Sequence, residues 1–247
     1  MRTAVVRPTD SGRPPARGFE AAMDNYLSLF TQYNIPAAFW VNIQLTFWAA
    51  IGALVIGTIL ALMRISPVPS FEAFGAGYVN IIRNTPLTII LLFGVLALYN
   101  QLGFRLSDDF QTNFFRLAVM GLSIYHAAFV CEAIRSGVNT VPQGQAEAAR
   151  AIGLGFLQSA SLVILPQAFR GAIVPLGNVL IALIKNTTVA AVGSVAVEAS
   201  SVMKTALEFR GDIIIPIFLT FAIGFVIIVI PVGLLTTWLS KKLAVAR

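Results

Sequence analysis

Residues 213–240 read IIIPIFLTFAIGFVIIVIPVGLLTTWLS, a stretch of 28 residues with no Asp, Glu, Lys or Arg. A helix of roughly 20 apolar residues crosses the hydrocarbon core of a bilayer, so this stretch is long enough to span a membrane. Two further uncharged stretches run from Asn25 to Met63 and from Asn84 to Phe104. Charged residues make up only 11% of the chain, whereas about 25% is usual in soluble domains. The sequence therefore predicts an all-α, polytopic membrane protein.

The distribution of charged and apolar residues predicts about five transmembrane helices within a transmembrane domain at 23–247. The preceding segment, 1–22, contains several arginines, Pro and Gly, and it lacks the hydrophobic run of a signal peptide. We expect this segment to be a disordered tail; that it is a start-site artefact, with Met23 as the true start, stays open. The five expected spans are 37–63, 85–104, 114–134, 172–193 and 213–240.

Composition excludes several kinds of site. The single cysteine, Cys131, rules out an internal disulfide and is expected to be a buried thiol, and the single histidine, His126, rules out a histidine cluster for a metal or haem. The chain has no G-x-x-x-x-G-K-[ST] sequence, so it carries no phosphate-binding loop of its own. We expect no catalytic residue, metal site or cofactor here; if the work requires ATP and Mg²⁺, another chain must bind them. The net charge of +6 does not indicate nucleic-acid binding, because four arginines fall in the tail.

The positions of Lys and Arg predict the orientation in the membrane. The loops after the first and third spans, together with the C-terminus, carry eight of these residues, and the loops after the second and fourth spans carry four when Arg116, at the start of the third span, is counted with them. Short loops rich in Lys and Arg face the cytoplasm. We therefore expect the C-terminus to be cytoplasmic and the N-terminus to be outside. The arginines of the tail conflict with this orientation, although they lie far from the first span.

A stretch at 145–166, QAEAARAIGLGFLQSASLVILP, interrupts the apolar pattern. Its alanines favour a short helix with little side-chain bulk, for which Pro142 suits the first turn and Thr140 is a candidate cap. Two glycines then end or bend this helix. A second short helix is expected over 156–165 and is ended by Pro166. The loop at about 140–166 is thus expected to be a rigid elbow of two short helices on the cytoplasmic side.

This stretch resembles the cytoplasmic loop of the permease subunits of ABC importers, in which E-A-A is followed by three residues, G, nine residues and I-x-L-P. In that family the loop docks in a groove of the ATP-binding subunit and couples its closure to the membrane helices. The resemblance implies the same role here, and the alternative is a connecting helix with no particular role. Val163 departs mildly from the Ile of the family. The matching residues are Glu147, Ala148, Ala149, Gly153, Leu165 and Pro166.

Further stretches are similar to the polar-amino-acid branch of these permeases and, more loosely, to glutamate-uptake permeases of Gram-positive bacteria. They include RNTPL at 83–87, LPQAFRGAIVPLGN at 165–178 and LIKNTTVAAV at 183–192. Members of this branch have five spans and an outside N-terminus, in agreement with the charge distribution. The resemblance implies a bacterial cell membrane as the location. It also implies partners: a dimer of ATP-binding subunits, a second permease subunit that is identical or homologous, an extracytoplasmic substrate-binding protein and the lipid bilayer.

Lys185 is the only charged residue between Arg170 and Glu198. A charge inside a membrane normally faces a bundle interior or a wet cavity, so contact with a substrate carboxylate and pairing with a structural acid both stay open. Asn178 and Thr188 lie on the same helical face as Lys185. Related permeases commonly carry Lys-Asp-Thr where this chain has Lys-Asn-Thr, and the missing acid favours an acidic or neutral substrate. The expected substrate pathway comprises Asn178, Lys185, Asn186 and Thr188.

Other polar residues of the spans receive structural interpretations. Glu132 and Arg135 are spaced as an i, i+3 ion pair, with a gating role as the alternative. His126 is interpreted as a hydrogen-bonded core histidine. Arg83 is interpreted as an anchor at the cytoplasmic interface, and Pro86 as a residue of the first turn of the second span.

These patterns lead to one principal hypothesis and two alternatives. The principal hypothesis is a permease subunit that translocates a polar amino acid, with glutamate as first candidate, by alternating access driven by a separate ATPase. An ion-coupled secondary amino acid transporter is the first alternative, but five spans do not divide into equal repeats and few acids lie within them. An intramembrane enzyme is the second alternative, and the chain offers little of the paired acids or histidines that it would need.

Overall fold

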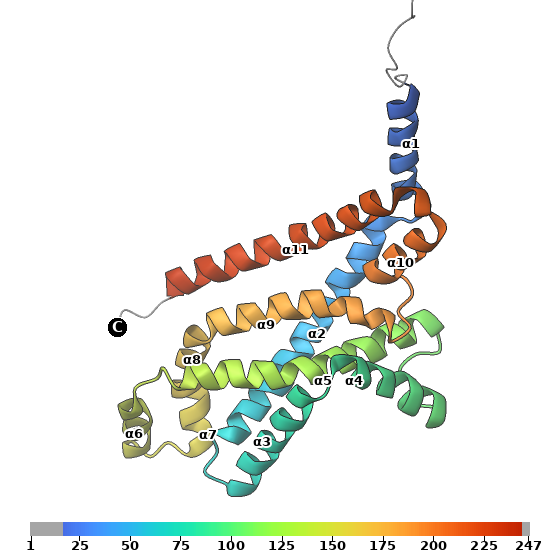
Figure 1. The fold of residues 1–247 in the computed structure, drawn as a ribbon. Coiled ribbons are helices and arrows are strands. Elements are labelled where there is room, and N and C mark those ends of the chain that lie inside the picture. The colour runs from blue at the N-terminus through green and yellow to red at the C-terminus, as the bar shows by residue number, and fades with distance from the viewer. Residues whose placement is uncertain (1–16, 244–247) are drawn as a thin grey trace, which may run out of the picture.

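The structure is a computed structural model that describes residues 17–243, and it describes side chains from Met23 onward except that of Asn25. Every element of the described chain is a helix (Figure 1). The elements are α1 (Arg17–Gln32), α2 (Ile35–Arg64), α3 (Pro69–Asn84), α4 (Leu87–Phe93), the π-helix η1 (Gly94–Gln101), α5 (Phe110–Val138), α6 (Gln143–Ala151), α7 (Phe156–Ser159), the π-helix η2 (Ala160–Ile164), α8 (Leu165–Gly171), α9 (Ile173–Asn186), the 3₁₀ turn η3 (Thr187–Ala191), α10 (Ala199–Phe209), the 3₁₀ turn η4 (Gly211–Ile213) and α11 (Ile214–Leu243).

Four of the five expected spans are confirmed by helices that are long and apolar enough to cross a membrane. The first corresponds to α2, the third to α5, the fourth to α9 with η3, and the last to η4 with α11. α5 begins at an N-cap, Asp109, whose carboxylate accepts a hydrogen bond from the Thr112 N–H. That hydrogen bond lowers the pKa of the Asp109 carboxyl below its ordinary value.

The second expected span, 85–104, is wrong as a single straight helix. α4 and η1 cover only Leu87–Gln101, and they are bent by 101° from α3, a helix that the sequence analysis did not expect. Thr85 and Pro86 lie at the bend with extended backbone, at ψ 129° and 136°. Proline has no N–H to donate and disfavours helical backbone in the residue before it, so the helix breaks here and Pro86 precedes the first turn of α4. Counting the bent pair as one span brings the total to five.

α5 is the centre of the molecule and packs mainly against α2, which crosses it (Figure 1). Small residues permit this close approach, because a Cβ added to Gly57 of α2 would lie only 2.6 Å from Val130 of α5. The interface includes Leu122 and Cys131, both fully buried, and Cys131 is the free thiol that the sequence predicted. α3 and α8 pack against α5 as well. Side chains on α5 therefore have neighbours on most of its faces.

A buried polar network joins α2 to the segment that follows α9. The Asn42 amide nitrogen donates to Thr187 Oγ1 at 2.9 Å and to Glu198 Oε2 at 3.1 Å. Glu198 is fully buried and caps α10, where its carboxylate accepts from the backbone N–H groups of Ser200 and Ser201. The amide groups at the helix N-terminus stabilise the negative charge without a cation. The network therefore fixes one end of α9 against α2 and α10.

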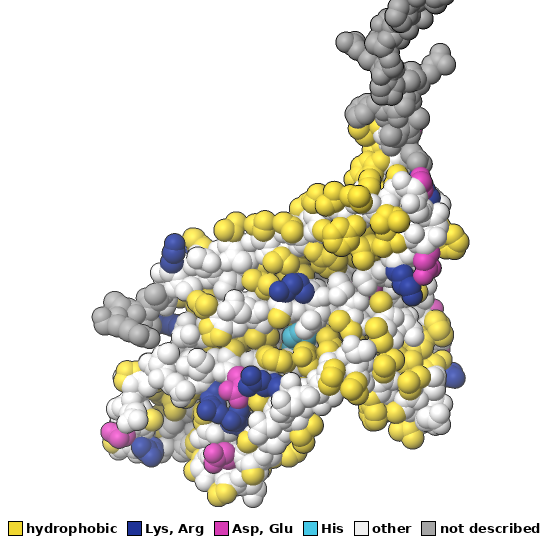
Figure 2. Space-filling view, viewed as in Figure 1, with side chains coloured by type: hydrophobic (Ala, Val, Ile, Leu, Met, Phe, Trp, Pro, Cys, Tyr) yellow, Lys and Arg dark blue, Asp and Glu magenta, His cyan; other side chains and the backbone are white. Residues whose placement is uncertain are grey.

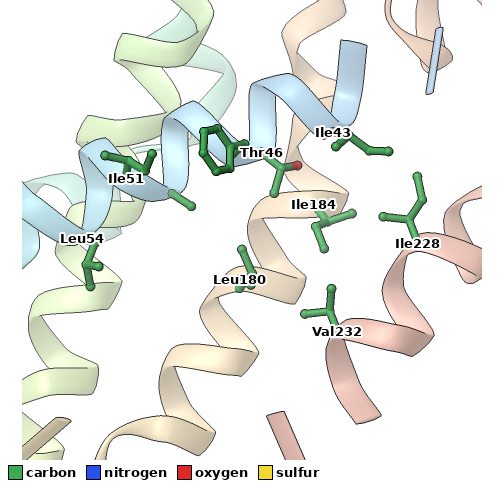
Figure 3. Close-up of a pocket in the computed structure, with 10 residues that line it drawn as sticks. Ile43, Thr46, Ile51, Leu54, Leu180, Ile184, Ile228 and Val232 are labelled. Carbon is green, nitrogen blue, oxygen red and sulfur yellow. The ribbon is translucent and has the colours of Figure 1, made fainter. Parts of the chain in front are cut away.

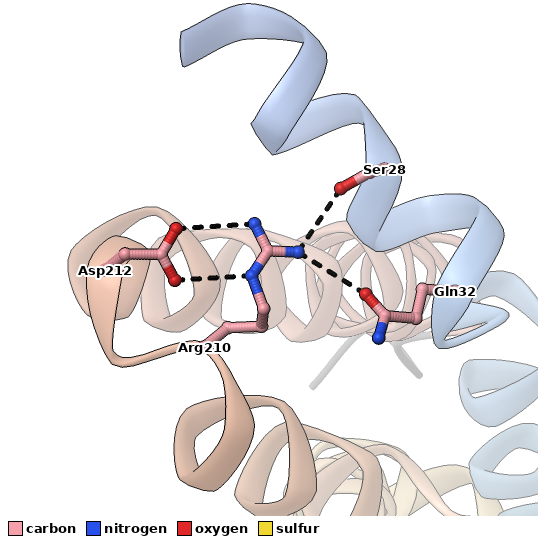
Figure 4. Close-up of polar contacts among 4 residues, drawn as sticks. All are labelled: Ser28, Gln32, Arg210 and Asp212. Carbon is pink, nitrogen blue, oxygen red and sulfur yellow. Dashed lines mark hydrogen bonds and ion pairs between the residues drawn. The ribbon is translucent and has the colours of Figure 1, made fainter. Parts of the chain in front are cut away.

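α1 is attached to the opposite end of the molecule from α6 and the C-terminal end of α11 (Figure 1). Arg210 Nη1 donates to Ser28 Oγ at 3.3 Å and to Gln32 Oε1 at 3.4 Å, while Arg210 Nε lies 3.3 Å from Asp212 Oδ1 (Figure 4). Leu29 of α1 is buried in the same cluster as Ile217 of α11. Residues 1–16 of the expected disordered tail lie outside the described part of the chain. Residues 17–22 belong to α1, which corrects the expected end of that tail.

Candidate functional site

The elbow at 140–166 is joined to the body of the protein through close backbone contacts. A Cβ added to Gly137, near the end of α5, would overlap the carbonyl oxygen of Ala168 in α8. Thr140 Oγ1 donates to Gly137 O at 2.7 Å, so Thr140 does not cap the next helix and that expectation is wrong. α6 begins after Pro142, whose ψ of 135° is not helical. The elbow therefore leaves α5 from a tightly packed joint, which suits a part that transmits movement.

The residues of the E-A-A motif lie on α6 and on the turn after it. Glu147 and Ala148 are exposed, whereas Ala149 is buried against the elbow. Gly153 follows α6 with a φ of +86°, a left-handed conformation that glycine adopts without the strain of a side chain. The motif thus presents an acid on the outside and a small residue on the inside. Leu165 is buried and Pro166 is exposed, 12 and 13 residues after Gly153.

Pro166 does not end the second helix, which corrects the sequence-based expectation. The chain is helical from Phe156 through Gly171, in three consecutive segments. The middle segment, η2, is a π-helix, and Pro166 falls in the first turn of α8 directly after it. Proline is tolerated in the first turn of a helix, where its missing N–H breaks no hydrogen bond of that helix. The hydrogen-bond register changes directly before Pro166, since the Leu165 N–H donates to the Ala160 carbonyl five residues back.

The elbow also exposes large apolar side chains that the sequence analysis did not single out. Ile152, Leu157 and Leu162 are 78%, 66% and 68% exposed, respectively. They lie in the same elbow as Glu147. Exposed apolar patches of this kind mark contact surfaces. The available signal in the sequence was that these residues stand outside the alanine-rich helix.

A cavity of about 380 Å³ lies between α5 and α9. It has both carboxamide and aromatic groups in its wall, and none of its lining residues is acidic. A concave site with a few polar groups among apolar ones is typical of binding sites for small molecules. The lining residues are Tyr125, His126 and Phe129 of α5 and Asn178, Val179, Ala182 and Asn186 of α9.

Arg83 places a positive charge beside this cavity. Its guanidinium carbon lies 5.6 Å from the centroid of the Phe129 ring, which lines the cavity. The sequence analysis assigned Arg83 an anchoring role and missed this position, because the contact depends on how α3 packs against α5. In Figure 2 a histidine side chain (cyan) lies below the surrounding surface, with Lys or Arg side chains above it and below it in the view. The basic group below it also contains an acidic side chain.

Glu132 is paired with arginines and does not line the cavity. Its carboxylate contacts Arg64, whose side chain is 14% exposed, and lies 4.0 Å from Arg135. The predicted pair with Arg135 is therefore present, and the sequence analysis missed the closer partner, Arg64. This ion pair joins the ends of α2 and α5. Glu132 is thus paired with Arg64 and Arg135, and none of the described acids lies within 4 Å of Arg83.

The structure brings two of the four expected pathway residues together in the cavity. Asn178 and Asn186 both line it, whereas Lys185 is exposed beside that wall and is not part of it. Thr188 Oγ1 donates to Lys185 O at 2.7 Å, so its hydroxyl is used within its own turn. His126 was expected to be a hydrogen-bonded core residue, and it does form two hydrogen bonds. One of them reaches Asn186 across the cavity wall, which gives His126 a place in the site.

A second hollow, of about 430 Å³, lies on the other side of α9 and is a hydrocarbon groove (Figure 3). Figure 3 shows side chains from α2, α9 and α11 converging on it. Thr46 is its one polar lining residue, and the Thr46 hydroxyl donates to Asn42 O at 2.8 Å. The groove therefore offers a polar substrate no unpaired hydrogen-bonding group.

Apolar spanning helices, a polar cavity between them and a protruding elbow of short helices define a permease subunit of a membrane transporter. The chain belongs to the family described as binding-protein-dependent transport system inner membrane component, which matches residues 53–245. It is a multi-pass inner membrane protein of the amino acid ABC importer type. These findings set aside the secondary transporter and the intramembrane enzyme.

Relatives of known assignment cover nearly the whole chain. The "Glutamate transport system permease protein GluC" of Corynebacterium efficiens is 49% identical over 219 residues, which are 87% of this chain and 96% of the relative. The "Probable glutamine ABC transporter permease protein GlnM" of Bacillus subtilis is 33% identical and covers 89% of this chain and 98% of its own length.

Solved structures share the same architecture. A crystal structure of an amino acid ABC transporter with histidines is 25% identical, with a TM-score of 0.70 over 90% of this chain and 97% of that one. The MetNI methionine ABC transporter, in an inward-facing conformation, has a TM-score of 0.71 at 19% identity. The latter likeness concerns the fold alone.

Proposed function

We propose that this permease translocates an acidic amino acid, with glutamate as first candidate, through a pathway that includes the cavity between α5 and α9. The observation that carries this proposal is the charge of the cavity. Arg83 lies against its aromatic wall, and none of the lining residues is acidic. Arg83 is exposed and its charge acts partly through water, yet a positive charge beside the cavity attracts a carboxylate and disfavours a cationic substrate. The 49% identity with a glutamate permease supports the same substrate.

The elbow is proposed to be the docking surface of a separate ATP-binding subunit, which would bind ATP and Mg²⁺. Glu147 and the apolar side chains of Ile152 and Leu157 are exposed in this one segment. Its joint to α5 at Gly137 is too close for a side chain, so a push on α6 reaches the central helix directly. A second permease subunit would supply the other half of the pathway, and an extracytoplasmic binding protein would deliver the substrate. The coupling residues are Glu147, Ala148, Ala149, Gly153, Leu165 and Pro166.

This function requires the elbow and the C-terminus to face the cytoplasm and the N-terminus to face outward. The elbow and the C-terminal end of α11 lie at one end of the molecule, and α1 lies at the other (Figure 1). Lys241 and Lys242 fall in the last turn of α11, as the positive-inside rule requires for a cytoplasmic end. An accessible cysteine introduced at residue 145 should react with an impermeant reagent only from the cytoplasmic side.

Uptake by the reconstituted transporter tests the substrate and the source of energy. The permease is assembled in proteoliposomes with its ATP-binding subunit and binding protein, and ATP-dependent uptake of labelled glutamate is measured. We expect saturable uptake that stops when the ATPase is omitted. Uptake driven by an ion gradient without any ATPase would contradict the proposal, and so would transport of arginine in preference to glutamate.

A charge reversal on α6 tests the docking surface. Glu147→Lys should lower uptake and co-purification of the ATPase by roughly tenfold or more, since misplaced like charges at an interface cost several kcal/mol. Gln145→Lys is the matched control, because Gln145 is exposed on the same helix and points in a different direction. Equal behaviour of the two variants would exclude Glu147 from the interface.

A further inference from the structure

His126 makes hydrogen bonds through both ring nitrogens. Nδ1 lies 2.9 Å from the carbonyl oxygen of Leu122, and Nε2 lies 3.1 Å from the amide nitrogen of Asn186. A carbonyl oxygen can only accept, so Nδ1 carries the hydrogen. Nε2 is then the acceptor and takes a hydrogen from the Asn186 amide. His126 is 1% exposed, so its ring is shielded from bulk water.

This pair of bonds fixes the orientation of the Asn186 carboxamide. If the amide were turned over, its oxygen would face the lone pair of Nε2, and two buried acceptors would oppose each other. In the other histidine tautomer Nδ1 carries no hydrogen, so its lone pair would face the Leu122 carbonyl oxygen and two acceptors would again oppose each other. The Asn186 nitrogen is therefore held toward the ring, and its oxygen, Oδ1, is held away from it. Asn186 lines the cavity, and Oδ1 accepts no hydrogen bond from the described residues.

The two ends of an amino acid match the two kinds of group at this cavity. An α-ammonium group needs an acceptor, and Asn186 Oδ1 is one that is fixed in direction. A carboxylate needs a cation, which Arg83 provides beside Phe129. Asn178, the other carboxamide of the wall, is not held by any hydrogen bond to the described chain, so its orientation is free.

We propose that His126 is a positioning residue that holds Asn186 Oδ1 toward the cavity, where it accepts a hydrogen bond from the α-ammonium group of the transported amino acid. The proposal rests on the proposed function in that it takes the cavity to be part of the pathway. It assigns recognition of the ammonium group to the permease itself. A dicarboxylate of the same length without the amine, glutarate, should then bind less tightly than glutamate.

Binding to the purified complex of permease and ATPase, without the binding protein, tests this inference. Titration calorimetry gives the dissociation constants of glutamate and of glutarate. We expect the wild-type complex to prefer glutamate by about tenfold or more, which is the contribution of a hydrogen bond to a charged group. In His126→Leu the Asn186 amide is free to turn, so the preference should fall toward one while the affinity for glutarate stays close to the wild-type value.

Three further variants separate positioning from general damage. His126→Gln offers a donor for the Leu122 carbonyl and an acceptor for the Asn186 amide, so it should keep most of the preference. Asn186→Leu should lose the preference, and the double variant of His126→Leu with Asn186→Leu should lose nothing further, because both changes remove one interaction. Asn178→Leu removes the other carboxamide of the cavity and should keep the preference for glutamate over glutarate.

Several outcomes would overturn the inference. It fails if His126→Leu keeps the preference, or if that variant weakens glutamate and glutarate equally. It also fails if Asn178→Leu loses the preference and Asn186→Leu keeps it. If His126→Leu does not assemble, His126→Gln and Asn186→Leu decide the question. If wild-type uptake of glutamate is ATP-dependent but the variants keep the wild-type preference, this inference alone fails. If no amino acid is taken up in an ATP-dependent manner, the proposed function fails.

Discussion

The two faces of α9 carry opposite chemistry. One face presents Asn178, Ala182 and Asn186 to the polar cavity, at intervals of four residues. The other presents Leu180 and Ile184 to the apolar groove. At 100° per residue these two sets project in nearly opposite directions. A single helix therefore separates a surface that can hold a polar solute from one that can hold only hydrocarbon.

The difference lies in which polar groups have partners. In the groove, the hydroxyl of Thr46 is bonded to the carbonyl of Asn42. In the cavity, Asn178 has no hydrogen-bond partner within the described chain, and Asn186 uses only its nitrogen. An unpaired amide inside a membrane is costly, so its presence marks a surface that meets water or a ligand. The comparison supports the cavity face, and not the larger groove, as the proposed pathway.

Filling each hollow with the same substitution is the strongest test of this comparison. Ala182→Leu adds three carbons to the cavity wall, and we expect uptake to fall by about a hundredfold, the loss that misplacing a bound group by an ångström can cause. Ala50→Leu adds the same carbons to the groove and should change uptake less than about twofold, because the lining there is already apolar. Initial uptake rates per assembled complex measure both. Equal losses would mean that the comparison is wrong.

Removing the charge beside the cavity should have the next largest effect. Arg83→Gln should raise the KM for glutamate about tenfold, since a hydrogen bond between charged groups contributes roughly 1.5–3 kcal/mol. Arg105→Gln is the matched control: Arg105 lies over Tyr99 at 5.9 Å, much as Arg83 lies over Phe129, but away from the cavity. The KM of each variant in proteoliposomes decides the matter. A tenfold rise in KM for both Arg83→Gln and Arg105→Gln would contradict a specific role of Arg83 at the cavity.

The charge-free stretches predicted the long helices well, because length and hydropathy alone decide whether a helix can span a bilayer. They did not predict α3 or the bend after it. The Thr85–Pro86 pair favours a break in the helix, but it lies in an uncharged run that was interpreted as one continuous span. The expectation at Pro166 failed for a related reason. The π-helix η2 packs against α6 within the folded elbow, a tertiary contact that no local sequence rule describes.

The cavity was half predictable. The interruption of an apolar span by Asn178 and by the Lys185–Asn186 pair pointed to the correct helix. The choice of face, however, was made from the charge of Lys185, and the wall of the cavity instead follows Asn178, Ala182 and Asn186. The opposite wall comes from α5, 49 to 61 residues earlier in the chain. Which residue of α5 meets which residue of α9 is decided by tertiary packing, so the contact between His126 and Asn186 had no signal in the spacing.

Replacing Lys185 sharpens the boundary of the cavity face. Lys185 is exposed, and none of the described acids lies within 4 Å of it. Lys185→Met should therefore weaken glutamate uptake by only about threefold, less than the change at Arg83, because Arg83 lies over the ring of a cavity residue, Phe129, whereas the Lys185 charge acts through water alone. Uptake at low and high salt provides the measurement, since screening should reduce the difference from wild type. A loss larger than that of Arg83→Gln would place the carboxylate at Lys185 instead.

A third face of α9 packs against α11, and substitution there should affect stability more than transport. A Cβ added to Gly177 would overlap the side chain of Thr236, whose χ1 is restricted because it is β-branched and whose hydroxyl is bonded to Val232 O. Gly177→Ala should therefore lower the free energy of unfolding by about 1–2 kcal/mol, the overpacking penalty less the gain in helix propensity. Gly233→Ala, on the other helix of this contact, places its Cβ 3.8 Å from Ile181 and should raise stability slightly. Thermal unfolding of the purified complexes measures the change in stability of each variant. We expect the two changes to have opposite signs because α9 contacts α11 through Gly177. Uptake per folded complex should stay near the wild-type rate in both variants, because this contact adds no group to the cavity.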